Sequence, residues 1–151
     1  MNANSKKIRK SVELNASAGK VWQVLTEDAY TRKWYAAFNE GSRAITTWEK
    51  GSKAVFTDEE GQGGIVGFIA ENNPGKLLVI EYTANLVNGK EDTESDTAKK
   101  FIGGREMYTL TEANGKTRLA IELDMDNEFF DFMDAAWDKA LEIFKALAEN
   151  N

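Results

Sequence analysis

The side chains that most often carry out catalysis are missing from this sequence. It contains no histidine and no cysteine, which excludes an imidazole base, a thiolate nucleophile and a zinc site built on either ligand. Any chemistry would have to come from carboxylates, tyrosines, lysines or arginines, and Glu122 and Arg105 are among the few candidates for such roles. We therefore predict no catalytic residue set and no cofactor.

Two short patterns resemble ligand sites but have simpler structural explanations. Asp124, Asp126 and Glu128 place oxygen ligands at alternate positions, yet the segment lacks the glycine and the distal glutamate of a calcium loop. Capping of a helix explains these acids, so we predict no metal site. The glycine-rich segment 61–67 leads into a strand-like run, which favours a hairpin over a phosphate-binding loop, because such a loop needs a helix after it.

Length and charge narrow the possible partners. The sequence has 151 residues and a formal net charge of −6, a size typical of one domain and a charge that argues against a nucleic acid partner. No apolar run approaches the roughly 18 to 20 residues that cross a bilayer, and the first ten residues lack the apolar core of a secretory signal. We expect a cytoplasmic protein without a membrane partner, either a monomer or a homodimer.

Hydrophobic periodicity predicts the elements that would position a site. An alternating strand over 8–14 is followed by two short helices over about 18–25 and 28–34, and Ser17 is a natural N-cap for the first. The last element is a helix over about 127–149 with a broad apolar stripe. Between these helices, strand-like runs separated by turns occupy about 43–49, 52–58, 63–71, 76–86, 104–112 and 116–125.

One segment, 88–100, contains only a single apolar residue, Ala98. A solvated loop is the simplest interpretation, and a lid over the mouth of a cavity is the alternative. Ser95, followed by Ala98, Phe101 and Ile102, could also begin one or two helical turns.

Consecutive strands joined by tight turns predict an α+β fold with an antiparallel meander. We expect a curved sheet of about six to seven strands wrapped on the long C-terminal helix, with the two short helices after the first strand. Residues 1–5 are expected to be disordered, and residues 6–149 to form a single domain.

Segments spread along nearly the whole sequence resemble a known family. Segment 12–27 is similar to the opening of the helix-grip superfamily, which includes START, polyketide cyclase and birch-pollen-allergen-like proteins. Within this superfamily, the segments 20–22 and 33–35 resemble the branch named for the activator of heat-shock-protein-90 ATPase. The resemblance implies a helix-grip fold.

Three further features carry the same resemblance. The segment 64–78 is similar to a strand-turn-strand unit of that branch, and 108–119 is similar to its penultimate hairpin. Trp137 and Leu141 stand where its final helix carries a tryptophan and a leucine. Ala136 departs from the pattern, because the family usually has a glycine there.

The resemblance implies non-enzymatic binding of a small hydrophobic or amphipathic ligand, lipid-like or aromatic, in a central cavity. A curved sheet gripped by a long helix is not always filled by its own side chains, and the remaining space can hold a ligand. Packing of the aromatic residues into a closed core is the alternative. We expect the cavity to be lined by large residues of the concave face and the facing helices: Trp34, Phe38, Trp48, Phe56, Tyr82, Tyr108, Phe129, Met133 and Trp137.

Two other functions stay open at this point. A protein-interaction or co-chaperone module would use an exposed surface and a chaperone partner, as the name of the branch implies. A cyclase- or hydrolase-like enzyme, a type found within the superfamily, would use a tyrosine, Glu122 or Arg105 at the cavity. In the ligand-binding interpretation, the hydroxyls of Tyr82 and Tyr108 would orient a polar group of the ligand.

Overall fold

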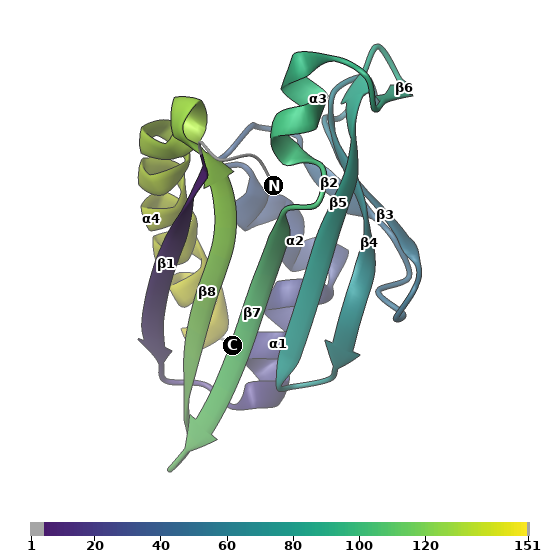
Figure 1. Ribbon diagram of the computed structural model, residues 1–151. Coiled ribbons are helices and arrows are strands. Elements are labelled where there is room, and N and C mark those ends of the chain that lie inside the picture. Colours follow the sequence, from purple (N-terminus) through teal and green to yellow (C-terminus); the bar gives the residue numbers. More distant parts are fainter. Residues whose placement is uncertain (1–4, 151) are drawn as a thin grey trace.

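The computed structural model describes residues 5–150, and its main feature is an antiparallel sheet of eight strands (Figure 1). The strand order is β1-β8-β7-β5-β4-β3-β2, and β6 pairs with β5. The expected disorder of residues 1–4 lies outside the described residues, whereas Ser5 already belongs to the first strand. The strands are β1 (Ser5–Leu14), β2 (Arg43–Ile45), β3 (Lys53–Thr57), β4 (Gly64–Asn73), β5 (Leu77–Val87), β6 (Lys90–Asp92), β7 (Arg105–Ala113) and β8 (Lys116–Asp126).

Helices cover one face of this sheet, and two of them, α1 and α4, have side-chain N-caps. The Ser17 hydroxyl accepts the backbone N–H of Lys20 at 3.2 Å, and the Asp126 carboxylate accepts that of Glu128 at 2.9 Å. Each cap satisfies an amide that the first helical turn leaves unpaired. Figure 1 shows α1, α2 and α4 together behind the sheet, with α4 against β1 and β8. The helices are α1 (Ala18–Thr26), α2 (Asp28–Tyr35), α3 (Asp96–Phe101) and α4 (Asn127–Glu149).

The main hydrophobic core lies between the helices and the inner face of the sheet. Trp34 of α2 and Phe144 of α4 are the largest of its fully buried side chains, and their ring centroids are 5.5 Å apart. The indole N–H of Trp34 donates to the carbonyl oxygen of Val24 at 2.9 Å, so this ring is buried without leaving its polar atom unpaired. The predicted α+β helix-grip architecture is confirmed.

The segment 88–100 has more structure than the predicted loop. Residues Lys90–Asp92 form β6, which raises the number of strands to eight. Ser95 is the N-cap of α3, and its hydroxyl accepts the backbone N–H of Ala98 at 3.1 Å. The helical turns that the sequence allowed after Ser95 are therefore present. This helix stands at the end of β5 in Figure 1.

The predicted strand over 43–49 is too long, because β2 ends at Ile45. Trp48 has a φ of +66°, a left-handed conformation that an extended strand does not allow. The side-chain amide of Asn72 donates to the Trp48 carbonyl at 2.6 Å and helps to hold this bend. None of the helices in the described part of the chain is long and apolar enough to cross a membrane.

Candidate functional site

A partly open cavity of about 520 Å³ lies between the helices and the inner face of the sheet. Helix α2 and the turn after it contribute Trp34, Tyr35 and Phe38 to its wall, and α4 contributes Met133 and Trp137. The sheet supplies further aromatic rings, and Phe101 of α3 lies at one side. The wall is therefore largely apolar, with only a few polar groups set into it.

Seven of the nine residues predicted to line a cavity lie on this wall. They come from α2 and the turn after it, from α4 and from strands β3, β5 and β7, which are far apart in sequence: Trp34, Phe38, Phe56, Tyr82, Tyr108, Met133 and Trp137.

The other two predicted residues, Trp48 and Phe129, are not part of the cavity wall. Trp48 lies beyond the end of β2, in the bend described above, and its ring centroid is 6.2 Å from that of Phe56. Phe129 stacks on Phe101 with a centroid distance of 5.5 Å, one helical turn before Met133. Each of the two aromatics thus contacts a residue that lines the cavity.

Aromatic contacts link the α2 region to α4 along the wall. The Trp137 ring lies 4.9 Å from Phe38, 5.9 Å from Trp34 and 6.1 Å from Tyr108, measured between centroids. Trp34 also meets Tyr35 edge-on at 4.5 Å. The Trp137 indole N–H is buried and has no hydrogen-bond partner within residues 5–150.

A carboxylate flanked by two phenols forms the main polar group of the wall. Glu106 of β7 accepts a hydrogen bond from the Tyr82 hydroxyl on Oε1 and one from the Tyr108 hydroxyl on Oε2. Glu106 and Tyr108 are two residues apart on β7 and so share one face of the sheet. Tyr82 reaches the carboxylate from β5, the neighbouring strand, where Ile80 is the direct partner of Glu106. We call these three residues the Tyr–Glu–Tyr cluster.

Burial dominates the electrostatics of this cluster. It raises the pKa of Glu106 above its ordinary value of 4.5, and the two tyrosine hydroxyls partly counteract it by stabilising the charged form. Burial, followed by the negative charge of Glu106, raises the pKa of Tyr108 and of Tyr82 well above the usual range. The same two causes raise the pKa of Tyr35. The phenols thus stay protonated and act as donors to Glu106.

The β3–β4 turn forms another part of the wall. Asp58 accepts backbone N–H groups of Gln62 at 2.9 Å and Gly63 at 3.1 Å, and these bonds lower the pKa of its carboxyl. At Gly64 an added Cβ would lie 1.9 Å from the Phe56 carbonyl oxygen, so only glycine fits. This glycine-rich segment is a hairpin, as predicted.

One cation, Arg43 of β2, also lies on the wall. It is half-buried, and its Nε has no hydrogen-bond partner within the described chain. In the β2–β3 ladder it is opposite Thr57, the residue before Asp58.

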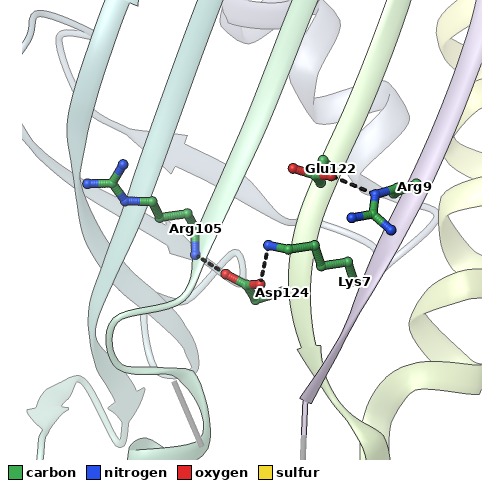
Figure 2. A network of polar contacts seen from close by, with 5 residues as sticks. All are labelled: Lys7, Arg9, Arg105, Glu122 and Asp124. Atoms are coloured by element: carbon green, nitrogen blue, oxygen red, sulfur yellow. Dashed lines mark hydrogen bonds and ion pairs between the residues drawn. The ribbon is translucent and has the colours of Figure 1, made fainter.

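Glu122 and Arg105, the enzyme candidates from the sequence, are on the outer face of the sheet. Glu122 accepts a hydrogen bond from the Nε of Arg9 at 2.7 Å, and the Arg105 side chain pairs with Glu81 at 2.9 Å. Figure 2 shows Arg9 and Glu122 beside the Lys7–Asp124 ion pair. Neither candidate lines the cavity.

Sequence reasoning missed Glu106 as a site residue, although a signal for it was present. Tyr108 was predicted to line the cavity, and a residue two positions away on the same strand points to the same face.

Among residues 5–150, no group of three acidic side chains is arranged to hold a metal ion, and Asp126 instead caps α4.

Comparison with known proteins places the chain in a family. The family model for activator of Hsp90 ATPase homolog 1-like proteins matches residues 15–149. The chain belongs to this family. A search of curated proteins finds no match.

Solved structures share the fold of this family member at low sequence identity. Protein CV1439 from Chromobacterium violaceum is 19% identical, with a TM-score of 0.71 over 96% of this chain and 98% of that one. The Aha1 dimer from Colwellia psychrerythraea is 18% identical, with a TM-score of 0.68 over 95% and 96%. CalU16 from Micromonospora echinospora is 17% identical, with a TM-score of 0.66 over 95% and 76%. At these identities the likeness concerns the fold alone.

Proposed function

We propose that this protein binds a small hydrophobic or amphipathic ligand in the cavity between α2, α4 and the sheet. The observation that carries the proposal is the wall itself: aromatic rings surround about 520 Å³ of space, and one carboxylate–phenol cluster is set among them. Ligand pockets typically enclose about 300 to 1,000 Å³ and combine an apolar wall with a few placed polar groups. The family and fold also support a ligand-binding domain.

The aromatic wall would hold the apolar body of the ligand. Trp34, Phe38 and Trp137 form a continuous surface from the α2 region to α4, and burying apolar area against it contributes roughly 25 cal/mol per Å². The Tyr–Glu–Tyr cluster would orient a polar group, since its hydroxyl and carboxylate oxygens keep free lone pairs.

A variant that fills the cavity tests this function. Met133 lies on the wall, whereas its neighbour Phe132 is 67% exposed on α4. In titrations with the neutral fluorescent probe N-phenyl-1-naphthylamine, Met133→Trp should weaken binding by roughly tenfold or more, because the indole takes up ligand space. Phe132→Trp, the matched control, should bind the probe like the wild type.

Thermal unfolding of both variants checks that they are folded, because overpacking can cost about 1 to 3 kcal/mol. Failure of the wild type to bind the probe, together with native mass spectra free of any co-purified small molecule, would contradict the proposal. Equal weakening by both variants would also contradict it, because Phe132 lies outside the cavity.

A chaperone partner is a second candidate function, favoured by the family match alone. We propose that this interaction uses the outside of the molecule and is therefore insensitive to Met133→Trp. ATP turnover by heat-shock protein 90, measured with and without this protein, tests the chaperone interaction. Unchanged turnover would contradict it. The Aha1 structure from Colwellia psychrerythraea is that of a dimer. This supports testing the present chain as a homodimer in the same assay.

A further inference from the structure

Glu106 is a carboxylate on the cavity wall that has no cationic partner within the described chain. Its two oxygens accept hydrogen bonds from Tyr82 and Tyr108, and no lysine or arginine within residues 5–150 forms an ion pair with it. Removing a carboxylate from bulk water is costly unless hydrogen bonds or a positive charge compensate it. The two phenols supply hydrogen bonds, but no lysine or arginine of the described residues lies within ion-pair distance of Glu106.

The hydrogen-bond directions show what the cluster offers to a ligand. Each tyrosine has one hydroxyl proton, and both protons are used on Glu106. With Glu106 ionised, only lone pairs of the carboxylate and of the two phenol oxygens remain for the ligand. The Tyr–Glu–Tyr cluster is therefore complementary to a group that donates hydrogen bonds, and most of all to one that carries a positive charge.

The rings next to the cluster favour the same kind of group. Tyr108 lies 6.1 Å from Trp137, which in turn lies 5.9 Å from Trp34. The faces of such rings attract ammonium groups electrostatically, and the attraction is strongest where water is excluded. An anion within an aromatic wall is thus suited to an organic cation.

The charge balance of the wall agrees with this interpretation. Its charged residues are two carboxylates, Asp58 and Glu106, and one guanidinium, Arg43. Asp58 is already engaged by the backbone N–H groups of Gln62 and Gly63 in its own turn. Glu106 is therefore the carboxylate that remains available to a ligand.

We propose that the ligand is an amphipathic organic amine whose protonated nitrogen binds the Tyr–Glu–Tyr cluster while its apolar body packs on the aromatic wall. This inference rests on the proposed ligand-binding function and narrows it to one chemical class.

Three probes with the same ring system and different head groups test the inference by isothermal titration calorimetry. They are 1-naphthylmethylamine, 1-naphthylmethanol and 1-naphthoic acid, which present an ammonium, a hydroxyl and a carboxylate. We expect the wild type to bind the amine roughly tenfold or more tightly than the alcohol, and the acid most weakly. This ranking is measured on the wild type, so it tests the inference even if a substitution prevents folding.

Glu106→Gln should remove the preference for the amine and leave binding of the alcohol in place, because the amide keeps the size of the side chain without its charge. Glu112→Gln is the matched control: it removes the same charge from an exposed position on the same strand, β7, and should keep the preference.

Equal binding of the amine and the alcohol would overturn the inference while leaving the ligand-binding function intact. Tightest binding of the acid would also overturn it and would assign the polar contact to Arg43. A preference for the amine that survives Glu106→Gln would overturn the role of the cluster. Absence of binding by all three, with N-phenyl-1-naphthylamine still bound, would again overturn the inference alone, and failure of every probe would remove both proposals.

Discussion

The two faces of the sheet hold carboxylates that have different partners. Glu106 of β7 lies on the inner face, whereas Glu122 and Asp124 of the neighbouring strand β8 lie on the outer face. Glu122 pairs with Arg9, and Asp124 pairs with Lys7 at 2.9 Å (Figure 2). Glu106 has two phenols instead of a cation.

The difference follows from where each side chain points. In the β7–β8 ladder, Glu106 is opposite the buried Leu123, whereas Glu122 is opposite Met107. Successive residues of a strand alternate between the faces, so adjacent carboxylates reach solvent on one side and the cavity on the other. Water screens a charge on the solvent side, so its ion-pair partner contributes little to stability. A charge in the cavity is screened less, so its free energy depends strongly on the groups around it. The inner face is therefore where substitutions should have large effects.

The largest effect should come from the aromatic wall that packs against the inner face of the sheet, where Trp34 of α2 lies. Trp34→Ala removes a fully buried ring and its hydrogen bond to Val24, and we expect it to lower the free energy of unfolding by about 3 to 5 kcal/mol. Urea unfolding followed by circular dichroism measures this loss. A loss below about 1 kcal/mol would show that the wall is not a packed part of the core.

Tyr108→Phe should have the next largest effect, because it removes a donor to Glu106 and keeps the ring. We expect a loss of about 1 to 3 kcal/mol at a pH where Glu106 is ionised, together with a further rise in the pKa of Glu106. Side-chain carboxyl NMR of the wild type and the variant measures this pKa. A pKa that falls or does not change would contradict the hydrogen-bond assignment.

The pH dependence of stability separates Glu106 from the outer carboxylates. Burial raises the pKa of Glu106 in the folded state above 4.5, so the folded state holds more protons than the unfolded state between these two pKa values. Stability relative to Glu106→Gln should therefore be highest below about pH 4.5 and fall as the pH rises through the folded-state pKa.

Unfolding curves of the wild type and Glu106→Gln across this range measure the difference, with Glu112→Gln as the control for an exposed glutamate on the same strand. A difference that grows with rising pH would mean that the hydrogen bonds from Tyr82 and Tyr108 outweigh burial, contrary to our assignment.

The smallest effect should come from the outer face. Arg9 is 69% exposed in its side chain, and we expect Arg9→Ala to change the free energy of unfolding by less than about 1 kcal/mol, with further weakening of the effect in salt. The same urea unfolding assay at low and high salt measures it. A loss as large as that of Trp34→Ala would contradict the contrast between the two faces.

Local signals made much of the fold predictable from the sequence. The caps at Ser17 and Ser95 and the alternation along the strands depend on neighbouring residues, and the structure has the corresponding helices and strands. The end of β2 could not be predicted in this way. Trp48 adopts its left-handed conformation beside a hydrogen bond from Asn72, a residue 24 positions away.

The site could be predicted only in part, for the same physical reason. Large aromatic side chains indicate a wall by their size, and Tyr82 and Tyr108 were expected on it. Their hydroxyls meet at Glu106, however, because β5 and β7 pair in a particular register, with Ile80 opposite Glu106. Such a register depends on the whole sheet, and a shift by one residue would turn Glu106 to the outer face.

Mapping the position of a bound ligand tests the central claim most directly. In two-dimensional ¹H–¹⁵N NMR spectra, titration with 1-naphthylmethylamine should shift the backbone amides of Tyr35, Tyr82 and Glu106, which line the cavity. The amides of Arg9 and Glu122, on the outer face, should stay in place. Shifts confined to these outer residues, or no shift at any residue, would contradict ligand binding at the Tyr–Glu–Tyr cluster.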